Sequence, residues 1–245
     1  MSRFVELDGC LNFRDLGGHR TVDGREVAWR RLFRADGLHR LTETGRVAFD
    51  ELGVVTVLDL RTQREVDQKA WRPSPGWAGQ WRHVPLVRQT PDWSNQDRAT
   101  LDDPGFAAAH YAEIVIEGAS GLREAVEALA EPGGLPAVFH CAAGKDRTGI
   151  LAALVLRLLG VPAEDVADDY AVSEQATARW VASVAATGTD DTAATWPYIP
   201  PSMLRSDRAT MLAFLTERGD ITDFAHSLGI TDDTIAKLRT ALLAP

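Results

Sequence analysis

A cysteine and an arginine stand six residues apart in the segment His140-Cys141-Ala142-Ala143-Gly144-Lys145-Asp146-Arg147-Thr148-Gly149. These residue types suit chemistry on a phosphate ester. A thiolate is a strong nucleophile, and the planar guanidinium of an arginine matches two phosphate oxygens and keeps its charge. The pattern therefore predicts that Cys141 accepts a phosphoryl group while Arg147 holds it.

The flanking residues must place this pair in a loop between a strand and a helix. An apolar run from Ala137 predicts a buried strand, and the apolar run Ile150 to Leu159, followed by Gly160, predicts a helix. Successive N–H groups that lead into a helix N-terminus bind anions and stabilise a thiolate. His140, next to the cysteine, either supports the thiolate or is a core histidine. The residues expected to bind phosphate are Ala142, Ala143, Gly144, Lys145 and Thr148.

The other segments indicate an α/β fold with a central, mostly parallel sheet flanked by helices. The β-branched, apolar run Val54 to Leu60 predicts a central strand. Asp59 lies at its carboxyl end, where open α/β sheets bind ligands. Phe4 to Leu7 suggests an edge strand, and Ser202 to Glu217 suggests one helix. The length of 245 residues favours a single domain, 1–245.

Charge and cysteine usage exclude several classes of protein. The formal net charge of −9 argues against nucleic-acid binding, so an anionic substrate must be attracted locally. Two cysteines, Cys10 and Cys141, are too few for a disulfide framework, although Cys10 could protect Cys141 in a disulfide. The histidines show no metal-ligand spacing, and we expect neither a metal nor another cofactor.

Targeting signals are also missing from the sequence. No classical signal peptide or run of about 20 apolar residues is present, so we expect no integral membrane segment. A catalytic thiol must stay reduced, which favours a cytoplasmic location, with export by a non-classical route left open.

The segment 140–149 resembles the phosphate loop of cysteine-dependent protein tyrosine phosphatases. Its Gly-Lys-Asp-Arg-Thr-Gly core and the N-terminal segment Leu11-Asn12-Phe13-Arg14-Asp15-Leu16-Gly17-Gly18 are similar to the atypical bacterial enzymes of the tyrosine phosphatase B type. The resemblance implies a cysteine-phosphatase fold with a helical lid inserted after the phosphate-loop helix, for which residues 172–204 are the candidate. It also implies that Arg14 and Asp15 support the phosphate loop, unless they form only a structural turn.

A phosphomonoester also needs an acid that protonates the leaving oxygen. Members similar to this chain carry an aspartate just before the loop arginine, which is Asp146 here. Asp59 is the second candidate, and the third is the group of loop aspartates Asp92, Asp102 and Asp103. Asp146 could instead be a structural carboxylate of the loop.

The sequence thus predicts phosphomonoester hydrolysis through a cysteinyl-phosphate. The substrates expected are phosphotyrosine proteins, with phosphoserine and phosphothreonine as further substrates and inorganic phosphate as product. The alternative is a phosphoinositide phosphatase, in which Lys145 meets extra phosphates. An inactive phosphate-binding module is disfavoured by the intact Cys141 and Arg147, and a sulfurtransferase by His140 and the Arg147-Thr148 pair.

Overall fold

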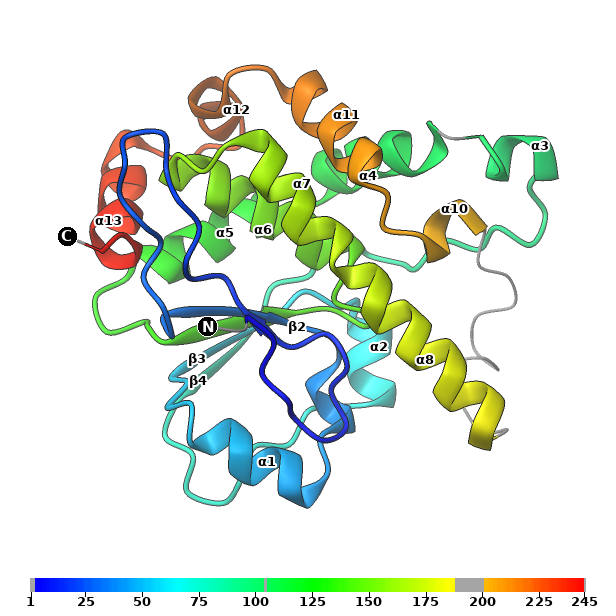
Figure 1. Ribbon diagram of the computed structural model, residues 1–245, viewed down its shortest axis with the longest axis horizontal. Coiled ribbons are helices and arrows are strands. Elements are labelled where there is room, and N and C mark those ends of the chain that lie inside the picture. The colour runs from blue at the N-terminus through cyan, green and yellow to red at the C-terminus, as the bar shows by residue number, and fades with distance from the viewer. Residues whose placement is uncertain (1–2, 104, 188–200, 245) are drawn as a thin grey trace.

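The protein is built on a five-stranded sheet with the strand order β1-β2-β5-β3-β4 (Figure 1). The computed structural model describes residues 3–103, 105–187 and 201–244. β1 pairs with β2 in antiparallel fashion, and the other three pairings are parallel. The predicted mostly parallel sheet is therefore confirmed. The strands are β1 (Arg14–Asp15), β2 (Leu32–Ala35), β3 (Thr56–Asp59), β4 (Gln80–His83) and β5 (Ala137–His140).

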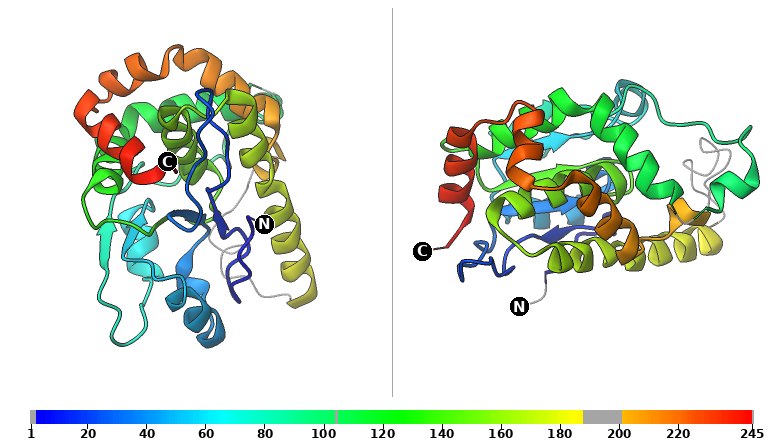
Figure 2. Two further views of the ribbon diagram at one scale, coloured as in Figure 1. Left: turned by 60° about the vertical axis from the view of Figure 1, so that its left-hand side comes forward. Right: turned by 90° about the horizontal axis from the view of Figure 1, so that it is seen from above.

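Helices cover both faces of the sheet, as predicted (Figures 1 and 2). α1 lies on one face, while α4 to α7 and the C-terminal helices lie on the other. The helices before the phosphate-loop strand are η1 (Leu38–Arg40), α1 (Glu43–Asp50), α2 (Gln63–Gln68), α3 (Arg98–Leu101), α4 (Phe106–Glu117) and α5 (Ala119–Ala130). Those after it are α6 (Asp146–Leu159), α7 (Ala163–Ala171), α8 (Ser173–Thr187), α10 (Pro201–Leu204), α11 (Arg208–Arg218), α12 (Ile221–Ser227) and α13 (Asp232–Leu242).

The two-residue period of the strands divides the core into two layers. Phe139 of β5 packs in the larger cluster with α4 to α7, whereas Val138 packs in the smaller one with Phe49 of α1. Both clusters consist of buried side chains, so the central strands are buried on both faces. This double burial holds the carboxyl end of β5 rigidly in the interior.

The register places the functional residues at one edge of the sheet. Ala35 of β2 and Asp59 of β3 both lie opposite His140, the last residue of β5. Because the three parallel strands end together, Cys141 follows directly at their shared carboxyl edge. This is the edge at which open α/β sheets bind ligands.

Some segments differ from the sequence-based expectation. Phe4 to Leu7 is not a strand, because only single bridges join Phe4 to Arg14 and Leu7 to Cys10; the antiparallel edge is β1. The expected helix from Ser202 is broken into α10 and α11, the second beginning after Asp207.

The lid candidate, residues 172–204, is described only in part. It contains α8 and α10, and its residues 188–200 lie outside the described residues. None of the helices in the described ranges has the length and apolar character needed to cross a membrane.

Candidate active site

The loop between β5 and α6 carries Cys141 at its start and Arg147 in the first turn of the helix. Gly144 lets the loop fold tightly against β2. Its φ is +67°, and a Cβ atom there would lie 2.6 Å from the backbone of Ala35 and Asp36. Only glycine meets both demands, so the loop residues 142–145 turn sharply into the N-terminus of α6.

Cys141 and Arg147 are both nearly buried, with 2% and 7% of their surface exposed. Burial lowers the pKa of Arg147, but electrostatic interactions, first with Glu65 and then with Cys141, outweigh it and raise this pKa. The sulfur therefore lies within electrostatic range of the guanidinium. The first turn of α6 therefore brings Arg147 close to Cys141, the two residues that the sequence predicted to act together.

A carboxylate that was not among the predicted site residues holds Arg147. Nη1 of Arg147 donates to Oε2 of Glu65 at 2.6 Å, and Nη2 donates to Oε1 at 2.9 Å. Burial alone would raise the pKa of Glu65, but the Arg147 charge and hydrogen bonds outweigh it and lower the pKa to about 2. Glu65 thus binds one edge of the Arg147 guanidinium and fixes its orientation.

Glu65 has a sequence signal that points to its position. Thr62-Gln63-Arg64-Glu65 is a capping box, in which Thr62 Oγ1 accepts from the Glu65 N–H and Glu65 Oε2 accepts from the Thr62 N–H. The capping box predicts the start of α2. It cannot predict that the same carboxylate reaches Arg147, 82 residues further along the chain.

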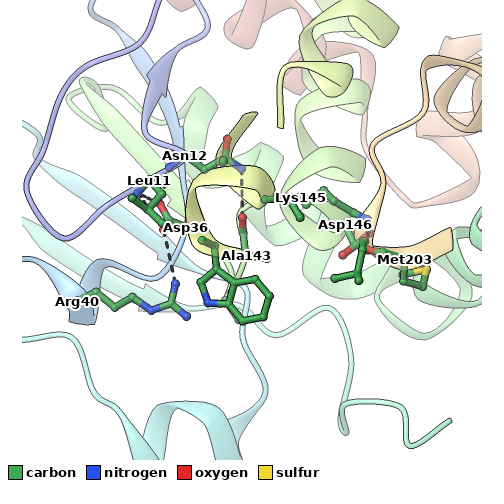
Figure 3. Close-up of a pocket in the computed structure, with 13 residues that line it drawn as sticks. Leu11, Asn12, Asp36, Arg40, Ala143, Lys145, Asp146 and Met203 are labelled. Atoms are coloured by element: carbon green, nitrogen blue, oxygen red, sulfur yellow. Dashed lines mark hydrogen bonds and ion pairs between the residues drawn. The ribbon is translucent and has the colours of Figure 1, made fainter. Parts of the chain in front are cut away.

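The N-terminal segment braces the phosphate loop from the other side. Asn12 Nδ2 donates to the carbonyl oxygens of Ala143 at 3.1 Å and Gly144 at 3.0 Å, and Arg34 Nη2 donates to Gly144 at 2.9 Å (Figure 3 shows the Asn12 contact with Ala143). These hydrogen bonds occupy the carbonyls of Ala143 and Gly144 and fix the backbone of the loop. The loop N–H groups are thereby left available for a phosphate.

Arg14 in turn holds Asn12, the residue that binds the loop carbonyls. It donates to Asn12 Oδ1 and to Asp169, and Asp169 also binds Arg34 at 2.7 Å. The two arginines hold the pKa of Asp169 well below its usual range although burial raises it. Arg14 therefore contacts Asn12, which binds the loop, and the supporting role that the family resemblance implies stays a prediction.

Asp15 has a different place from the one expected. Its two oxygens accept from the backbone N–H groups of Gly17 at 2.8 Å and Arg30 at 2.7 Å. Asp15 thus holds the N-terminal turn, which was the alternative interpretation. Arg14 and Asp15 are successive residues of β1, so their side chains point to opposite faces of the strand and only that of Arg14 faces Asn12 and Asp169.

Asp59 forms a buried ion pair beneath Cys141. It is fully buried, and Arg61 donates to its two oxygens at 2.8 and 2.6 Å. Burial raises the pKa of Asp59, but His140 and Arg61 lower this pKa by more than burial raises it, so the carboxyl is held ionised. Asp59 is thus fully buried in an ion pair and does not line the cavity described below, which favours Asp146 over Asp59 as the candidate acid.

His140 connects this pair to the nucleophile. Its Nε2 lies 3.6 Å from Asp59 Oδ2, and its Nδ1 contacts the carbonyl oxygen of Cys141 at 3.2 Å. Because a carbonyl only accepts, Nδ1 is the donor. Burial lowers the pKa of His140. The ring holds the backbone of Cys141.

Asp146 is the first residue of α6, and 23% of its side chain is exposed. Tyr111 donates to its Oδ1 at 2.6 Å, and Lys145 Nζ lies 3.3 Å from the same oxygen. Three other candidate acids, Asp92, Asp102 and Asp103, are exposed in the segment around α3 and do not line the cavity described below. Asp146 is the candidate acid that faces this cavity.

Lys145 is buried, whereas the phosphoinositide alternative requires it to meet extra phosphates of the substrate. Its ammonium donates to the carbonyl oxygens of Met203 and Arg205, the latter at 2.8 Å. The last carbonyls of a helix lack partners within the helix, and Lys145 supplies one for the end of α10. Figure 3 shows Lys145 and Asp146 side by side, close to Met203.

Thr148 Oγ1 is buried in the first turn of α6 and makes no hydrogen bond with any described residue. Thr148 therefore does not donate to the Cys141 sulfur in this arrangement. Cys10 donates to Asp36 Oδ1 at 2.7 Å, and both cysteines are free. Burial and the Asp36 charge raise the pKa of Cys10, so this thiol stays protonated.

A cavity of about 80 Å³ lies over residues 142, 143, 145 and 146 of the phosphate loop, and Cys141 and Arg147 are not among the residues that line it (Figure 3). Both described parts of the lid candidate, α8 and α10, contribute to its wall. The cavity is lined by Leu11, Asn12, Asp36, Arg40, Ala142, Ala143, Lys145, Asp146, Ala176, Thr177, Trp180, Met203 and Leu204.

The fold and the loop together define an enzyme of the phosphatase class: a cysteine at the end of a central strand, loop amides at a helix N-terminus, and an arginine fixed beside them. Comparison with known proteins supports this assignment to the phosphatase class. Residues 5–244 match the model of the tyrosine phosphatase family, and the chain belongs to this family.

Two relatives show the extent of the similarity. The chain is 30% identical over 196 residues to the triple specificity protein phosphatase PtpB of Mycobacterium tuberculosis, covering 67% of each protein. It is 31% identical over 141 residues to a tyrosine-protein phosphatase of Nostoc commune, covering 57% of this chain and 47% of that protein. The match to the family model covers more of the chain than either relative does.

Proposed function

We propose that the protein hydrolyses phosphotyrosine in proteins through a cysteinyl-phosphate, and that phosphoserine and phosphothreonine are further substrates. The observation that carries the proposal is the fixed guanidinium of Arg147, held by both oxygens of Glu65 next to Cys141. An arginine oriented in advance binds two phosphate oxygens without losing further conformational freedom.

The reaction has two steps in this proposal. The Cys141 sulfur attacks phosphorus while the bond to the leaving oxygen breaks, and Asp146 gives that oxygen its proton. Water then attacks the phosphorus and releases the sulfur, and Asp146 takes the proton from the water. The loop N–H groups and Arg147 stabilise the charge on the phosphoryl oxygens in both steps.

The cavity supports an aryl ester as the preferred substrate. Its wall above the loop includes Trp180, Met203 and Leu204, which can pack against an aromatic ring. A phosphoinositide is the alternative substrate, and the sequence argument for it depended on Lys145. Because Lys145 binds two backbone carbonyls, its ammonium is not directed at a second phosphate. The relative named as a triple specificity phosphatase supports a broad range of phosphoesters.

A comparison of substrates in the presence of EDTA tests this proposal. We expect turnover of phosphotyrosine peptides, slower turnover of matched phosphoserine and phosphothreonine peptides, and inhibition by vanadate. Faster release of phosphate from phosphoinositide vesicles than from phosphotyrosine peptides would show that the lipid is the better substrate. A requirement for added metal would contradict the cysteine mechanism.

Replacement of Asp146 by asparagine tests the acid. We expect Asp146→Asn to reduce kcat on phenyl phosphate by about 10²- to 10⁴-fold, the usual contribution of general acid catalysis. The reduction on p-nitrophenyl phosphate should be much smaller, because this leaving group needs little protonation. Steady-state rates on the two esters provide the measurement. Asp92→Asn, a change of the same kind in the exposed loop, is the matched control and should preserve the ratio of the two rates.

A further inference from the structure

Two buried tyrosines from different helices meet at Asp146. Tyr111 of α4 and Tyr170 of α7 are 0% and 1% exposed. Tyr111 Oη lies 2.6 Å from Asp146 Oδ1 and 2.6 Å from Tyr170 Oη. The two rings pack edge to face, with their centroids 6.2 Å apart. The three side chains form a short line of oxygens that ends at the candidate acid.

The hydrogen bonds in this line have a defined direction. Each tyrosine hydroxyl has one proton to donate. A carboxylate can only accept, so Tyr111 donates to Asp146, and Tyr170 must then donate to Tyr111. Burial, followed by the Asp146 charge, raises the pKa of both tyrosines, so both hydroxyls keep their protons. Successive bonds of this kind polarise one another and strengthen the last one.

The line of hydroxyls gives the two oxygens of Asp146 different hydrogen-bonding surroundings. Both partners that the described residues supply, Tyr111 and Lys145, lie at Oδ1. The side chain is partly exposed and lines the cavity over the phosphate loop. Oδ2 is therefore the oxygen on which a transferable proton can reside.

The packing of α6 is adapted to this arrangement. A Cβ atom at Gly149 would lie 3.1 Å from the ring of Tyr170, so a glycine in the first turn of α6 allows the close approach of this tyrosine. Phe214 packs against Tyr111 with a centroid distance of 6.0 Å and fixes the ring from the other side. The hydroxyls are held in place by the packing of four helices, α4, α6, α7 and α11.

We propose that Tyr111 and Tyr170 are positioning residues for Asp146, and that their hydroxyls anchor Oδ1 and stabilise the carboxylate formed when Oδ2 gives up its proton. This inference rests on the proposed function. In the first step the S–P bond forms, the P–O bond breaks, and the Oδ2 proton moves to the leaving oxygen. In the second step a water oxygen binds phosphorus, the S–P bond breaks, and a water proton returns to Oδ2. Tyr111 and Tyr170 keep their own protons throughout.

Removal of single hydroxyls tests the proposal. We expect Tyr111→Phe to reduce kcat on phenyl phosphate by about 10- to 100-fold, the value of a hydrogen bond to a charged group. Tyr170→Phe removes only the outer link and should reduce kcat about twofold. KM and inhibition by inorganic phosphate should stay at wild-type values in both variants, because neither tyrosine contacts the phosphate loop amides.

A double variant separates positioning from general destabilisation. In an Asp146→Asn background, Tyr111→Phe should cause no further loss on phenyl phosphate, because the group that it positions is gone. An equal loss in both backgrounds would show a structural role and overturn the inference. Wild-type kcat in Tyr111→Phe, combined with an impaired Asp146→Asn, would overturn the inference and leave the proposed function intact. Wild-type rates in Asp146→Asn would reject the acid itself and the inference with it.

Discussion

Cys141→Ser will reduce turnover of p-nitrophenyl phosphate by about 10⁴- to 10⁶-fold, the range seen when an enzyme loses its nucleophile. A serine hydroxyl attacks only after a base removes its proton. The neighbouring His140 cannot serve as that base, because its Nδ1 donates to a backbone carbonyl and its Nε2 faces the buried Asp59. Single-turnover measurements with excess enzyme should show no rapid release of p-nitrophenol.

The same variant should still bind its substrate. Arg147, Glu65 and the loop N–H groups are unchanged in Cys141→Ser, so calorimetry should detect binding of a phosphotyrosine peptide. Cys10→Ser is the matched control: a serine hydroxyl can donate to Asp36 as the thiol does, and most of the activity should remain. Wild-type turnover in Cys141→Ser would reject the cysteinyl-phosphate.

Arg147→Lys is expected to reduce kcat/KM by about 10²- to 10⁴-fold. A lysine keeps the positive charge but loses the planar fork, so it cannot bind both oxygens of Glu65 and two oxygens of a phosphate together. Losing two hydrogen bonds to charged groups costs about 3–6 kcal/mol, which corresponds to this range of rates. Steady-state kinetics with p-nitrophenyl phosphate and the inhibition constant of vanadate provide the measurements.

Glu65→Gln tests whether the orientation of the guanidinium matters. Its amide offers one acceptor in place of two, so we expect a loss of about 10-fold in kcat/KM, smaller than the loss in Arg147→Lys. Glu131→Gln removes an Arg–Glu pair of the same kind from the surface, where Glu131 binds Arg82 at 2.5 Å, and should leave the rate unchanged. If kcat/KM of Glu65→Gln equals that of the wild type, Arg147 needs no carboxylate partner to hold its position.

The local sequence was sufficient to predict the elements that carry the nucleophile. The apolar run before Cys141 forms β5, and the apolar run after Arg147 forms the buried helix α6, because both signals depend on neighbouring residues. Helix starts with side-chain caps were also predictable, as at Thr42 and Thr231. Short-range signals failed where a segment depends on distant partners, as in the N-terminal segment, where the edge strand formed at Arg14–Asp15 and not at Phe4 to Leu7.

The sequence by itself determined the reactive pair, because the six-residue spacing of Cys141 and Arg147 across a helix start brings them together in any fold that keeps the strand and the helix. Only the tertiary structure decided what surrounds this pair. Glu65 reaches Arg147 from α2, Tyr111 reaches Asp146 from α4, and Lys145 turns to the carbonyls at the end of α10. Such contacts join segments 35 to 82 residues apart. They are set by the packing of helices on the sheet, which no local pattern of residues encodes.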